Sequence, residues 1–468
     1  MPSELREALT AAGTTALTPK LIDTLLLEYQ RRYSPLVRAI PTTNWNSTVY
    51  YFNQRTVVAS GGFVSDGGAT PVSNSTYVQN SFTMAHLQVV GAVTGYAQEV
   101  TRQIIGDLRQ TEIEGSIRGM YWDIETGIDW GNSASTANGA RPQYDGLDTL
   151  VSTWSGANQN SQDKAGNTLT LAMLDELIDM VETQAAMPVF DSTWMLVMSN
   201  TAASKVAQLM VSQQRFNDAV EVAPGLIANS YRNIPIIKTS FLSPRSFAMS
   251  TVTPGAGTGA LPGGLSGLTG SLANATYKYY VSAVIARSGE TLPCAEVSQA
   301  TGGSSGFIQL AFTPPTGLDS SSPILYKVYR TAAGGAANSE TLLGFVDATV
   351  GLAADGVTPV MATAIYDTGA ALIPVVGAGT TVPGTLSTSY FGTNSGQFPL
   401  AAGYENIYLI SRDRNFVIRP YVRECMPLDI YPVSTSPDTL PYALITDCTF
   451  AVRAPKYTGR LGRVSTAV

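Results

Sequence analysis

The pattern of apolar and polar positions changes several times along this chain of 468 residues. The first 40 residues are polar, with an amphipathic turn after Pro19, for which Thr18 is the expected N-cap. Residues 47–94 instead predict two long strands, Thr48–Val58 and Thr76–Val93, because both are rich in β-branched and aromatic residues and flank a glycine-rich tip. We therefore expect an extended β-hairpin.

The expected hairpin carries almost no charge, since Asp66 is the only formal charge from Thr56 to Gln98. Natural proteins protect exposed edge strands with charges, especially lysine, or with proline. An unprotected hairpin must be covered, either by its own domain or, as we favour, by a neighbouring subunit. The tip glycines permit positive φ. The candidate inter-subunit assembly residues lie in the tip and on charged positions beside it: Gly61, Gly62, Phe63, Asp66, Gly67, Gly68, Arg55, Glu99, Arg102 and Arg109.

A long amphipathic pattern follows the hairpin. From Glu99 to Trp130 apolar residues recur at helical spacing, and charged residues occupy the opposite face. This predicts a helix of about 45 Å if it is unbroken, at about 1.5 Å per residue. Glycines within it, among them Gly106, weaken the helix.

Helices and strands then alternate up to about residue 250. We expect a helix with Thr170 as its N-cap, a buried strand over Ser192–Ser199, a helix after Asn200, and a short strand in NIPIIKTSFLSP. This alternation is typical of a mixed sheet with helices packed against it.

Composition shifts sharply at about residue 250, where a Gly/Pro/Ser-rich segment predicts a linker. Short strands with period-2 alternation and intervening turns follow, which predicts a small β-sandwich. The strands are Tyr277–Ile285, Phe307–Pro314, Ile324–Arg330, Leu342–Asp347 and Met361–Asp367. From Tyr390 the chain returns to mixed character and ends in strands that we expect to pair back to the first region.

Charged residues make up only 13% of the chain, about half the usual ~25%. A soluble monomer with so few charges associates readily, so we expect partners to cover much of the surface. The alternative is a low-charge secreted protein. The net charge of −7 argues against a dedicated nucleic-acid binder, which would carry a basic stripe, although not against a container for DNA. We expect neither a signal peptide nor a membrane span, and we expect reduced thiols at Cys294, Cys425 and Cys448.

No short motif in the sequence gives strong support for a catalytic or cofactor-binding site. His86 is the only histidine, so a metal site with two histidine ligands is excluded, and its mid-strand position favours a structural role. The string Gly302–Gly306 matches a nucleophile elbow in letters only, because no histidine follows it. The GAGTG at 255–259 lacks the glycine spacing of a dinucleotide site. We expect no catalytic residue, cofactor or metal; the alternative is a carboxylate pair that folding brings together, as in glycoside hydrolases.

The order of several segments along the chain is characteristic. YSPLVRAIPTT precedes the hairpin and the following helix ends in DIETGIDWG; then come ARPQYDGL, TWMLVMSNTAASKVAQL, NIPIIKTSFLSP and, near the end, AVRAPKYTGRL. This order resembles that of the major capsid proteins of tailed bacteriophages with the HK97-like fold, over most of residues 30–250 and 385–468. YKVYRTAAGG and IYDTGA in the block between resemble fibronectin type III or Ig-like modules.

The resemblance implies an α+β HK97-like capsid fold with an inserted all-β Ig-like sandwich. It implies the following parts: 1–46 an N-terminal arm; 47–94 the extended loop; 95–145 a peripheral domain with a spine helix; 146–250 an axial domain; 251–385 the inserted sandwich, decorating the exterior; 386–468 a return to the axial and peripheral domains. The implied function is a virion shell protein that self-assembles into hexamers and pentamers around double-stranded DNA, without sequence-specific binding.

Two departures qualify the resemblance. Some family members join their subunits by an isopeptide bond from a loop lysine, but no lysine lies between Lys20 and Lys164, so we expect non-covalent cohesion. Only a short stretch precedes the arm, so we expect no fused scaffolding region. Expected partners are therefore a separate scaffolding protein, a portal and a decoration or cement protein, with no membrane.

Two alternatives stay open. One is an encapsulin-like nanocompartment shell, which has the same fold and packages enzymes. The other, from a different class, is a secreted glycan-binding protein or hydrolase with a fibronectin-like module, in which Trp122 and Trp130 could stack against sugars. The lack of a visible signal peptide weighs against the second alternative.

Overall fold

The structure, a computed structural model, describes residues 34–66, 68–69, 72–102, 106–133, 143–152, 160–190, 193–212, 219–223, 226–242, 245–262, 265, 268–317, 322–352, 359–376, 400, 403–429 and 438–466. Gly67 and the expected N-terminal helix with Thr18 and Pro19 lie outside the described residues. The described residues fall into two compact units. Unit 1 contains those of Val89–Ile117 and Pro427–Leu444, and unit 2 contains those of Arg32–Gln88, Arg118–Met426 and Ile445–Val468.

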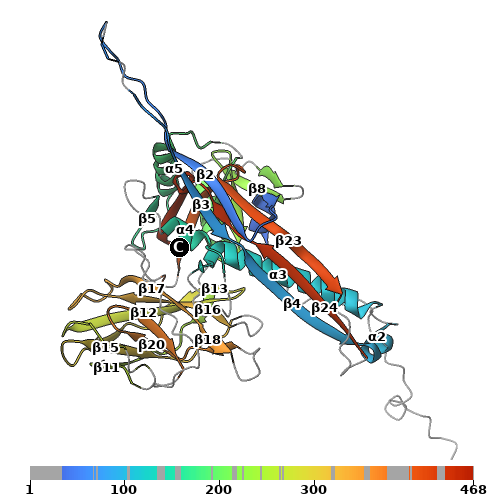
Figure 1. Cartoon of the computed structure of the whole chain (residues 1–468), viewed down its shortest axis with the longest axis vertical. Coiled ribbons are helices and arrows are strands. Elements are labelled where there is room, and N and C mark those ends of the chain that lie inside the picture. The colour runs from blue at the N-terminus through green and yellow to red at the C-terminus, as the bar shows by residue number, and fades with distance from the viewer. Residues whose placement is uncertain are drawn as a thin grey trace, which may run out of the picture. The chain divides into compact units, whose positions relative to one another are not determined.

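The predicted hairpin is present but shorter than expected. Strands β2 (Val49–Val57) and β3 (Thr76–Thr83) pair antiparallel in a sheet of their own (Figure 1). The second expected strand divides at Met84, whose N–H donates to the carbonyl of Thr48 (3.0 Å). Its continuation, β4 (Ala85–Thr94), belongs to a different sheet, because Met84 packs into an apolar cluster at the hairpin base and the chain changes partner there.

That second sheet joins distant parts of the chain. Its order is β1-β23-β24-β4, and β25 pairs with β23. The elements are β1 (Thr42–Asn44), β23 (Val417–Asp429), β24 (Thr439–Cys448) and β25 (Ala451–Val452), with the short helix α1 (Pro35–Ala39) preceding β1. The expectation that the C-terminal strands pair back to the first region is confirmed.

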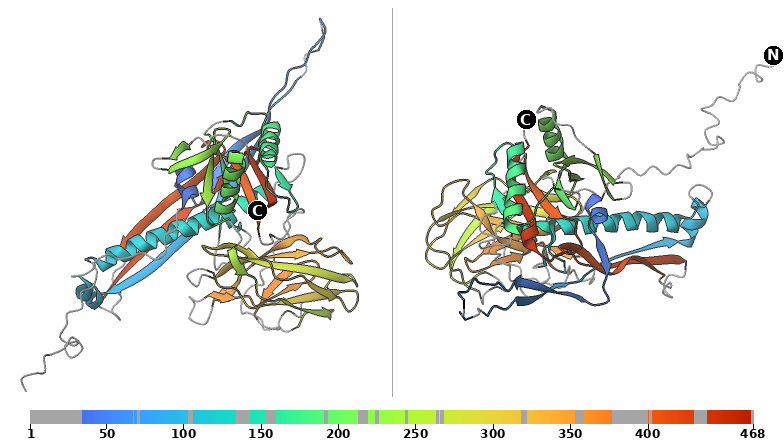
Figure 2. Two further views of the ribbon diagram at one scale, coloured as in Figure 1. Left: turned by 180° about the vertical axis from the view of Figure 1, so that it is seen from behind. Right: turned by 90° about the horizontal axis from the view of Figure 1, so that it is seen from above.

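The expected helix over 99–130 is two helices, α2 (Gly95–Thr101) and α3 (Leu108–Trp130). The chain turns at Gly106, whose φ of +83° is a left-handed conformation that glycine adopts without strain. The carboxylate of Asp107 then accepts the Gln110 N–H (3.1 Å) and so caps the start of α3. Within unit 1, Figure 2 shows the first part of α3 alongside β4 and β24, and the Ser116 hydroxyl on α3 lies 3.1 Å from that of Tyr442 on β24.

The predicted mixed sheet with helices is confirmed in unit 2. Strand β6 (Trp194–Ser199) pairs parallel with β9 and antiparallel with β22. Thr170 caps α5 as expected, since its hydroxyl accepts the Met173 N–H (3.4 Å). The sheet order is β5-β26-β22-β6-β9-β8-β7. The other elements are α4 (Leu147–Ser152), β5 (Ser161–Asp163), α5 (Leu171–Ala185), α6 (Asn200–Ser212), β7 (Ala219–Ala223), β8 (Leu226–Tyr231), β9 (Ile234–Thr239), β22 (Tyr404–Ser411), the 3-10 turn η5 (Pro455–Tyr457) and β26 (Thr458–Ser465).

The β-rich block consists of two larger sheets that share an apolar core. One has the order β10-β13-β12-β16-β17 with β14 beside β12, and the other the order β11-β15-β20-β21. Their bounds are β10 (Arg245–Ala248), β11 (Thr253–Thr258), β12 (Thr276–Ile285), β13 (Gly289–Leu292), β14 (Val297–Ala300), β15 (Gly306–Ala311), β16 (Pro323–Arg330), β17 (Thr341–Asp347), β20 (Ala364–Asp367) and β21 (Leu372–Val375), with β18 (Thr349–Leu352) and β19 (Pro359–Met361) as a separate pair.

The segment that we expected to be a linker contains strand β11, which pairs with β15 along its whole length. The prediction of a linker was therefore wrong at this position. A side chain at Gly257 would collide with the ring of Phe307 on the paired strand. Glycine here permits close packing within a sheet, which composition alone cannot distinguish from flexibility.

Buried charges tie the block to the rest of unit 2. The Lys327 ammonium on β16 contacts Asp148 of α4 (2.6 Å) and Glu290 of β13 (3.1 Å), and all three side chains are nearly inaccessible. Asp148 also faces Arg460 of β26 at 3.6 Å. Burial alone would raise the pKa of Asp148, but Lys327 and Arg460 outweigh it and hold this pKa below its ordinary value.

Candidate assembly surface

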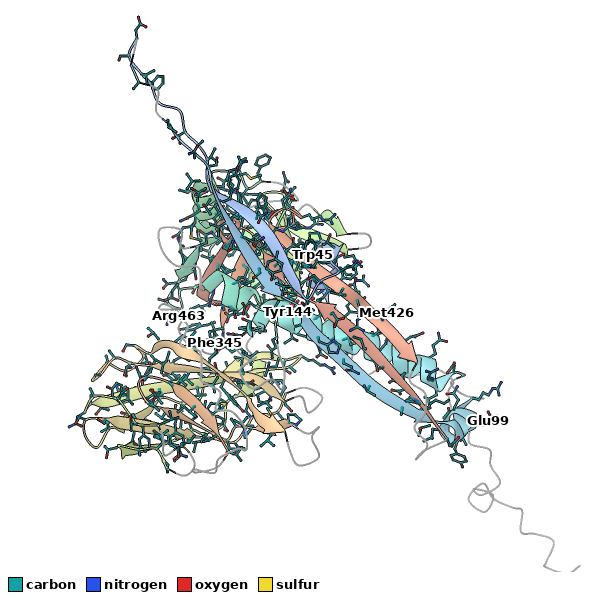
Figure 3. All side chains as sticks on the ribbon, viewed as in Figure 1. Trp45, Glu99, Tyr144, Phe345, Met426 and Arg463 are labelled. Carbon is teal, nitrogen blue, oxygen red and sulfur yellow. The ribbon has the colours of Figure 1, made fainter. Side chains whose placement is uncertain are left out.

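The base of the hairpin is fastened by aromatic packing. Tyr50 of β2 is buried and meets Trp45 edge-on at a centroid distance of 4.8 Å. Phe52 stacks on Tyr50 at 6.1 Å and on Phe82 of β3 at 5.9 Å. The guanidinium of Arg453 lies over the Tyr50 ring (5.3 Å) and donates a hydrogen bond to its hydroxyl. Trp45 marks this base in Figure 3.

Beyond the base, apolar side chains of the hairpin face solvent on both sides of the ribbon. The exposed large apolar residues of the hairpin are Tyr51, Val57, Val58, Phe63, Val64, Val72, Tyr77 and Val78. Phe63 is fully exposed, and the first four residues of β3 are all exposed, so no alternation of buried and exposed faces remains there. A monomeric protein rarely leaves such an apolar patch uncovered.

The edges of the hairpin are also open. Among the described residues β2 and β3 pair only with each other, so each presents backbone groups of its outer edge to solvent. The hairpin carries two charged residues, Arg55 and Asp66. Arg55 lies over the ring of Tyr77 at 5.3 Å, and Asp66 is exposed in the tip. Few charges therefore oppose association along these edges.

The structure brings the described tip candidates together in the loop between β2 and β3: Gly61, Gly62, Phe63, Asp66 and Gly68. Glycine permits positive φ, but Gly61, Gly62 and Gly68 do not adopt it in this loop. A turn closes the tip, where the Gly68 N–H donates to the carbonyl of Ser65 (2.8 Å). Serine side chains also brace the loop, since the hydroxyls of Ser75 and Ser73 accept the backbone N–H groups of Ala59 (3.1 Å) and Ser60 (3.0 Å).

The other candidates lie in unit 1 and not on the hairpin. Glu99 and Arg102 form an exposed ion pair at 3.5 Å along α2. Arg109 lies in the first turn of α3, where its N–H donates to the side chain of Gln98 (3.1 Å) and its guanidinium to the carbonyl of Pro441 (3.2 Å). Arg109 therefore has an intramolecular structural role. Sequence reasoning missed the exposed apolar residues of this unit: Val90, Tyr96, Val100 and Leu440.

His86 forms a polar row with residues on two other strands of unit 2. Its Nδ1 lies 2.5 Å from Asp447 of β24, whose second oxygen accepts from Arg423 of β23 at 2.5 Å. Burial would raise the pKa of Asp447, but hydrogen bonds from Arg423 and His86 outweigh it and lower this pKa. The row is a cross-strand brace and offers no nucleophile. Within the described part of the chain, no cluster of three or more His, Cys, Asp or Glu could bind a metal.

No helix among the described residues is both long and apolar enough to cross a membrane. The three cysteines are free thiols, and burial raises the pKa of Cys294 and of Cys448 to about 11. The α+β class expected from the sequence is confirmed, including its hairpin, its long helix and its helix-covered mixed sheet.

Comparison with solved structures finds similar chains at low identity. An encapsulin complex from Synechococcus elongatus PCC 7942 has a TM-score of 0.48 and 10% identity, covering 99% of this chain and 98% of that chain. The capsid of a native GTA particle has a TM-score of 0.47 and 8% identity, covering 98% and 100%. A chain from Mycobacterium phage Bobi has a TM-score of 0.45 and 10% identity, covering 97% and 99%. No curated protein matches the sequence.

The decisive comparison is with sequence families. The family model described as SU10 major capsid protein matches residues 9–246, just over half of the chain, including the hairpin and both α2 and α3. The chain therefore belongs to the SU10 major capsid protein family: it is a major capsid protein that forms a phage head, and it resides in the virion capsid.

Proposed function

We propose that this capsid protein assembles with copies of itself into hexamers and pentamers of an icosahedral head that encloses double-stranded DNA. The supporting observation is the β2–β3 hairpin, whose apolar side chains and strand edges are exposed in the single chain. Each Å² of apolar surface that is removed from water contributes about 25 cal/mol to the free energy of association. A neighbouring copy that covered the hairpin would therefore gain stability at every contact in the shell.

Cohesion in this proposal is non-covalent. The chain has no lysine between Lys20 and Lys164, so the hairpin supplies no amine for an isopeptide bond. Its exposed tip residues, Phe63 among them, would supply apolar contact, and Asp66 would form its polar contact with a neighbour. Glu99 and Arg102 are exposed on unit 1 and would contribute at the rim of an interface, where ion pairs affect specificity more than affinity.

The test is deletion of residues Ala59–Asn74, which contain the whole tip. The hairpin base is held by Trp45, Tyr50 and Phe52, so the variant should fold and stay soluble. We expect it to fail to form closed particles under electron microscopy and to elute as unassembled subunits. Closed particles at the yield of the natural chain would refute the role of the hairpin.

Point variants separate the apolar contribution from loop length. Phe63→Ser and Val72→Ser each remove an exposed apolar side chain from the tip. Val211→Ser is the matched control, since Val211 is 75% exposed on α6, outside the hairpin. We expect the tip variants to lower particle yield and the control to leave it unchanged. Equal effects of all three would indicate general loss of apolar surface and would contradict the proposal.

The contents of the particles test the cargo. Double-stranded DNA inside them agrees with the proposed head, whereas packaged protein would favour an encapsulin-like compartment. We do not expect catalytic activity, in keeping with a structural capsid family. A separate scaffolding protein, a portal and a decoration protein stay predictions.

The partition of the chain is also a proposal. Residues 251–385 would form an inserted Ig-like or fibronectin type III-like module at the capsid exterior, supported by two β-sheets around a common apolar core. The remaining parts would be the arm at 1–46, the extended loop at 47–94, the peripheral region at 95–145 and the axial region at 146–250 with its return at 386–468. The split of the expected loop at Met84 favours ending the loop there.

A further inference from the structure

Two acidic side chains are completely buried on one face of α3. Glu125 and Asp129 lie one helical turn apart, and both are 0% exposed. A buried carboxylate is costly unless it is paired with a cation or well hydrogen-bonded. Among the described residues no basic side chain forms an ion pair with either of them. This pair has no role in the proposed assembly of the hairpin.

Glu125 binds the segment that precedes β1. Its Oε1 accepts the N–H of Leu36 (3.2 Å), and its Oε2 accepts the N–H of Val37 (3.1 Å). Both N–H groups belong to the first turn of α1, whose donors have no partner within the helix. A single carboxyl on α3 thus satisfies the backbone of a segment almost 90 residues earlier in the chain, at the start of the described structure.

Apolar packing holds the same segment. Leu36, Val37 and Ile40 are buried in a core cluster that includes Ile124 and Ile128 of α3. These apolar contacts favour the docked segment in both charge states of Glu125, so the charge changes the opening equilibrium without deciding it alone. The carboxyl therefore adjusts an attachment that the hydrophobic contacts establish.

Asp129 makes the environment of Glu125 more acidic. Neither of its carboxyl oxygens has a hydrogen-bond partner among the described residues. Burial, followed by the adjacent Glu125, raises the pKa of Asp129 well above its ordinary value, and the nearby Thr239 hydroxyl opposes this only in part. Glu125 has two N–H donors and Asp129 has none, so Asp129 is the poorer site for a negative charge.

Other titratable and charged groups lie on the elements packed around the pair. Tyr144, marked in Figure 3, donates to the carbonyl of Ile124 (2.9 Å), and burial raises its pKa. Arg419 of β23 pairs with Glu424, and Tyr408 of β22 donates to Asp148 at 3.3 Å. The remaining groups are the buried thiol Cys448 of β24, the hydroxyl Thr239 and exposed Lys238 of β9, and exposed Arg38 of α1.

We propose that Glu125 is a proton-gated latch for residues 34–40: its neutral carboxyl keeps this segment docked on α3, and its ionised carboxylate favours opening. Opening would let water reach the charge, which the closed arrangement keeps buried without a cation. The latch concerns the attachment of this segment and is independent of the proposed covering of the hairpin by a neighbour.

The direction of the pH dependence follows from proton linkage. Burial raises the pKa of Glu125 from 4.5 to about 8, although the N–H groups of Val37 and Leu36 lower it in part. In the open state water reaches the carboxyl and its pKa returns toward the ordinary value. Between pH 4.5 and about 8, the closed state therefore binds one more proton than the open state. The stabilisation of the closed state by this proton is fully present below pH 4.5 and is lost as pH rises toward 8. One proton corresponds to a change of about tenfold per pH unit in the opening equilibrium.

The test is amide hydrogen exchange of the full-length unassembled chain, read at residues 36–40. After correction for the intrinsic rate, we expect the protection factors of the natural chain to fall about hundredfold between about pH 5.5 and 7.5. The amides of β6 serve as internal reference. Protection at 36–40 that does not change with pH, or that changes in step with β6, would overturn the proposal, and neither result requires a variant.

Two variants on α3 assign the effect to its residue. Glu125→Gln cannot ionise and should give a flat pH profile. Glu112→Gln makes the same chemical change at an exposed position of the helix and should keep the slope of the natural chain. If Glu125→Gln kept that slope, another group would be responsible and the latch would be refuted. Circular dichroism verifies that both variants fold.

Discussion

Replacing Lys327 by methionine should strongly destabilise unit 2. The Lys327 side chain is 2% exposed, and its ammonium contacts Asp148 at 2.6 Å and Glu290 at 3.1 Å. It also lies 4.8 Å from the ring centroid of Trp130. Methionine fills a similar volume but leaves two carboxylates in an apolar surrounding. Asp148 would keep Arg460 at 3.6 Å, whereas Glu290 would lose its only described cation.

The size of the effect follows from this arrangement. Removing one partner of a buried ion pair costs about 3–5 kcal/mol, while replacing both partners by neutral groups of similar volume is often near neutral. The double variant Lys327→Met with Glu290→Gln should therefore recover much of the loss, because the amide can still bond the hydroxyls of Ser282 and Tyr329. The two changes would be strongly non-additive.

The assay is denaturant unfolding of the soluble chain, followed by tryptophan fluorescence, with Lys238→Met as matched control. Lys238 is an exposed lysine on β9, so its replacement should change the free energy of unfolding by less than about 0.5 kcal/mol. The loss in Lys327→Met should be largest near neutral pH and smaller in acid, where the unpaired carboxylates take up protons. A cost below about 1 kcal/mol, or a double variant as unstable as the sum of its parts, would refute the assigned role of this network.

Three further predictions concern packing and charge elsewhere. In Gly91→Ala the added carbon would lie 2.5 Å from the Tyr442 ring. We therefore expect this variant to lower the free energy of unfolding by about 1–3 kcal/mol in a denaturant titration. In Gly115→Ala the added carbon on α3 has no atom within 4 Å, so this variant should raise the free energy of unfolding by about 0.5–1 kcal/mol. A lower free energy of unfolding would contradict the conclusion that space is free beside Gly115. The lowered pKa of Asp447 means that its stabilisation is present above its ordinary value of 3.8 and is lost as pH falls through the lower folded value. Asp447→Asn should therefore lower stability at neutral pH and flatten the acid limb of the pH–stability curve; an unchanged curve would show that the brace with Arg423 contributes nothing.

Local patterns were sufficient for most of the elements. Period-2 runs predicted β12, β16 and β17 to within one residue at each end, because each strand carries its own alternation of side chains. The strand expected at β15 extended three residues too far, to Pro314. The shortage of charge between Thr56 and Gln98 identified the hairpin that the structure leaves exposed. The helix pattern after Glu99 was recognised as well, although the interruption at Gly106 was underestimated.

The errors arose where a distant partner decided the outcome. Strand β11 forms from a glycine-rich segment because β15 offers an edge and Phe307 needs space beside Gly257. The long second strand of the hairpin divides at Met84 because its continuation finds β24 as a partner. Pairing of this kind depends on segments that lie tens to hundreds of residues apart in the sequence, and no local window contains it.

By itself the sequence determined the α+β class, the hairpin with its missing charges and the helix-covered sheet, since periodicity and composition are properties of neighbouring residues. The order of its segments carried the resemblance to capsid proteins. Only the tertiary structure decided which charges are buried. Lys327 and Glu125 look like ordinary surface residues in the sequence, and their environments come from α4, β13 and α1. The energy of a charge depends on the groups and the solvent around it, and folding alone brings those together.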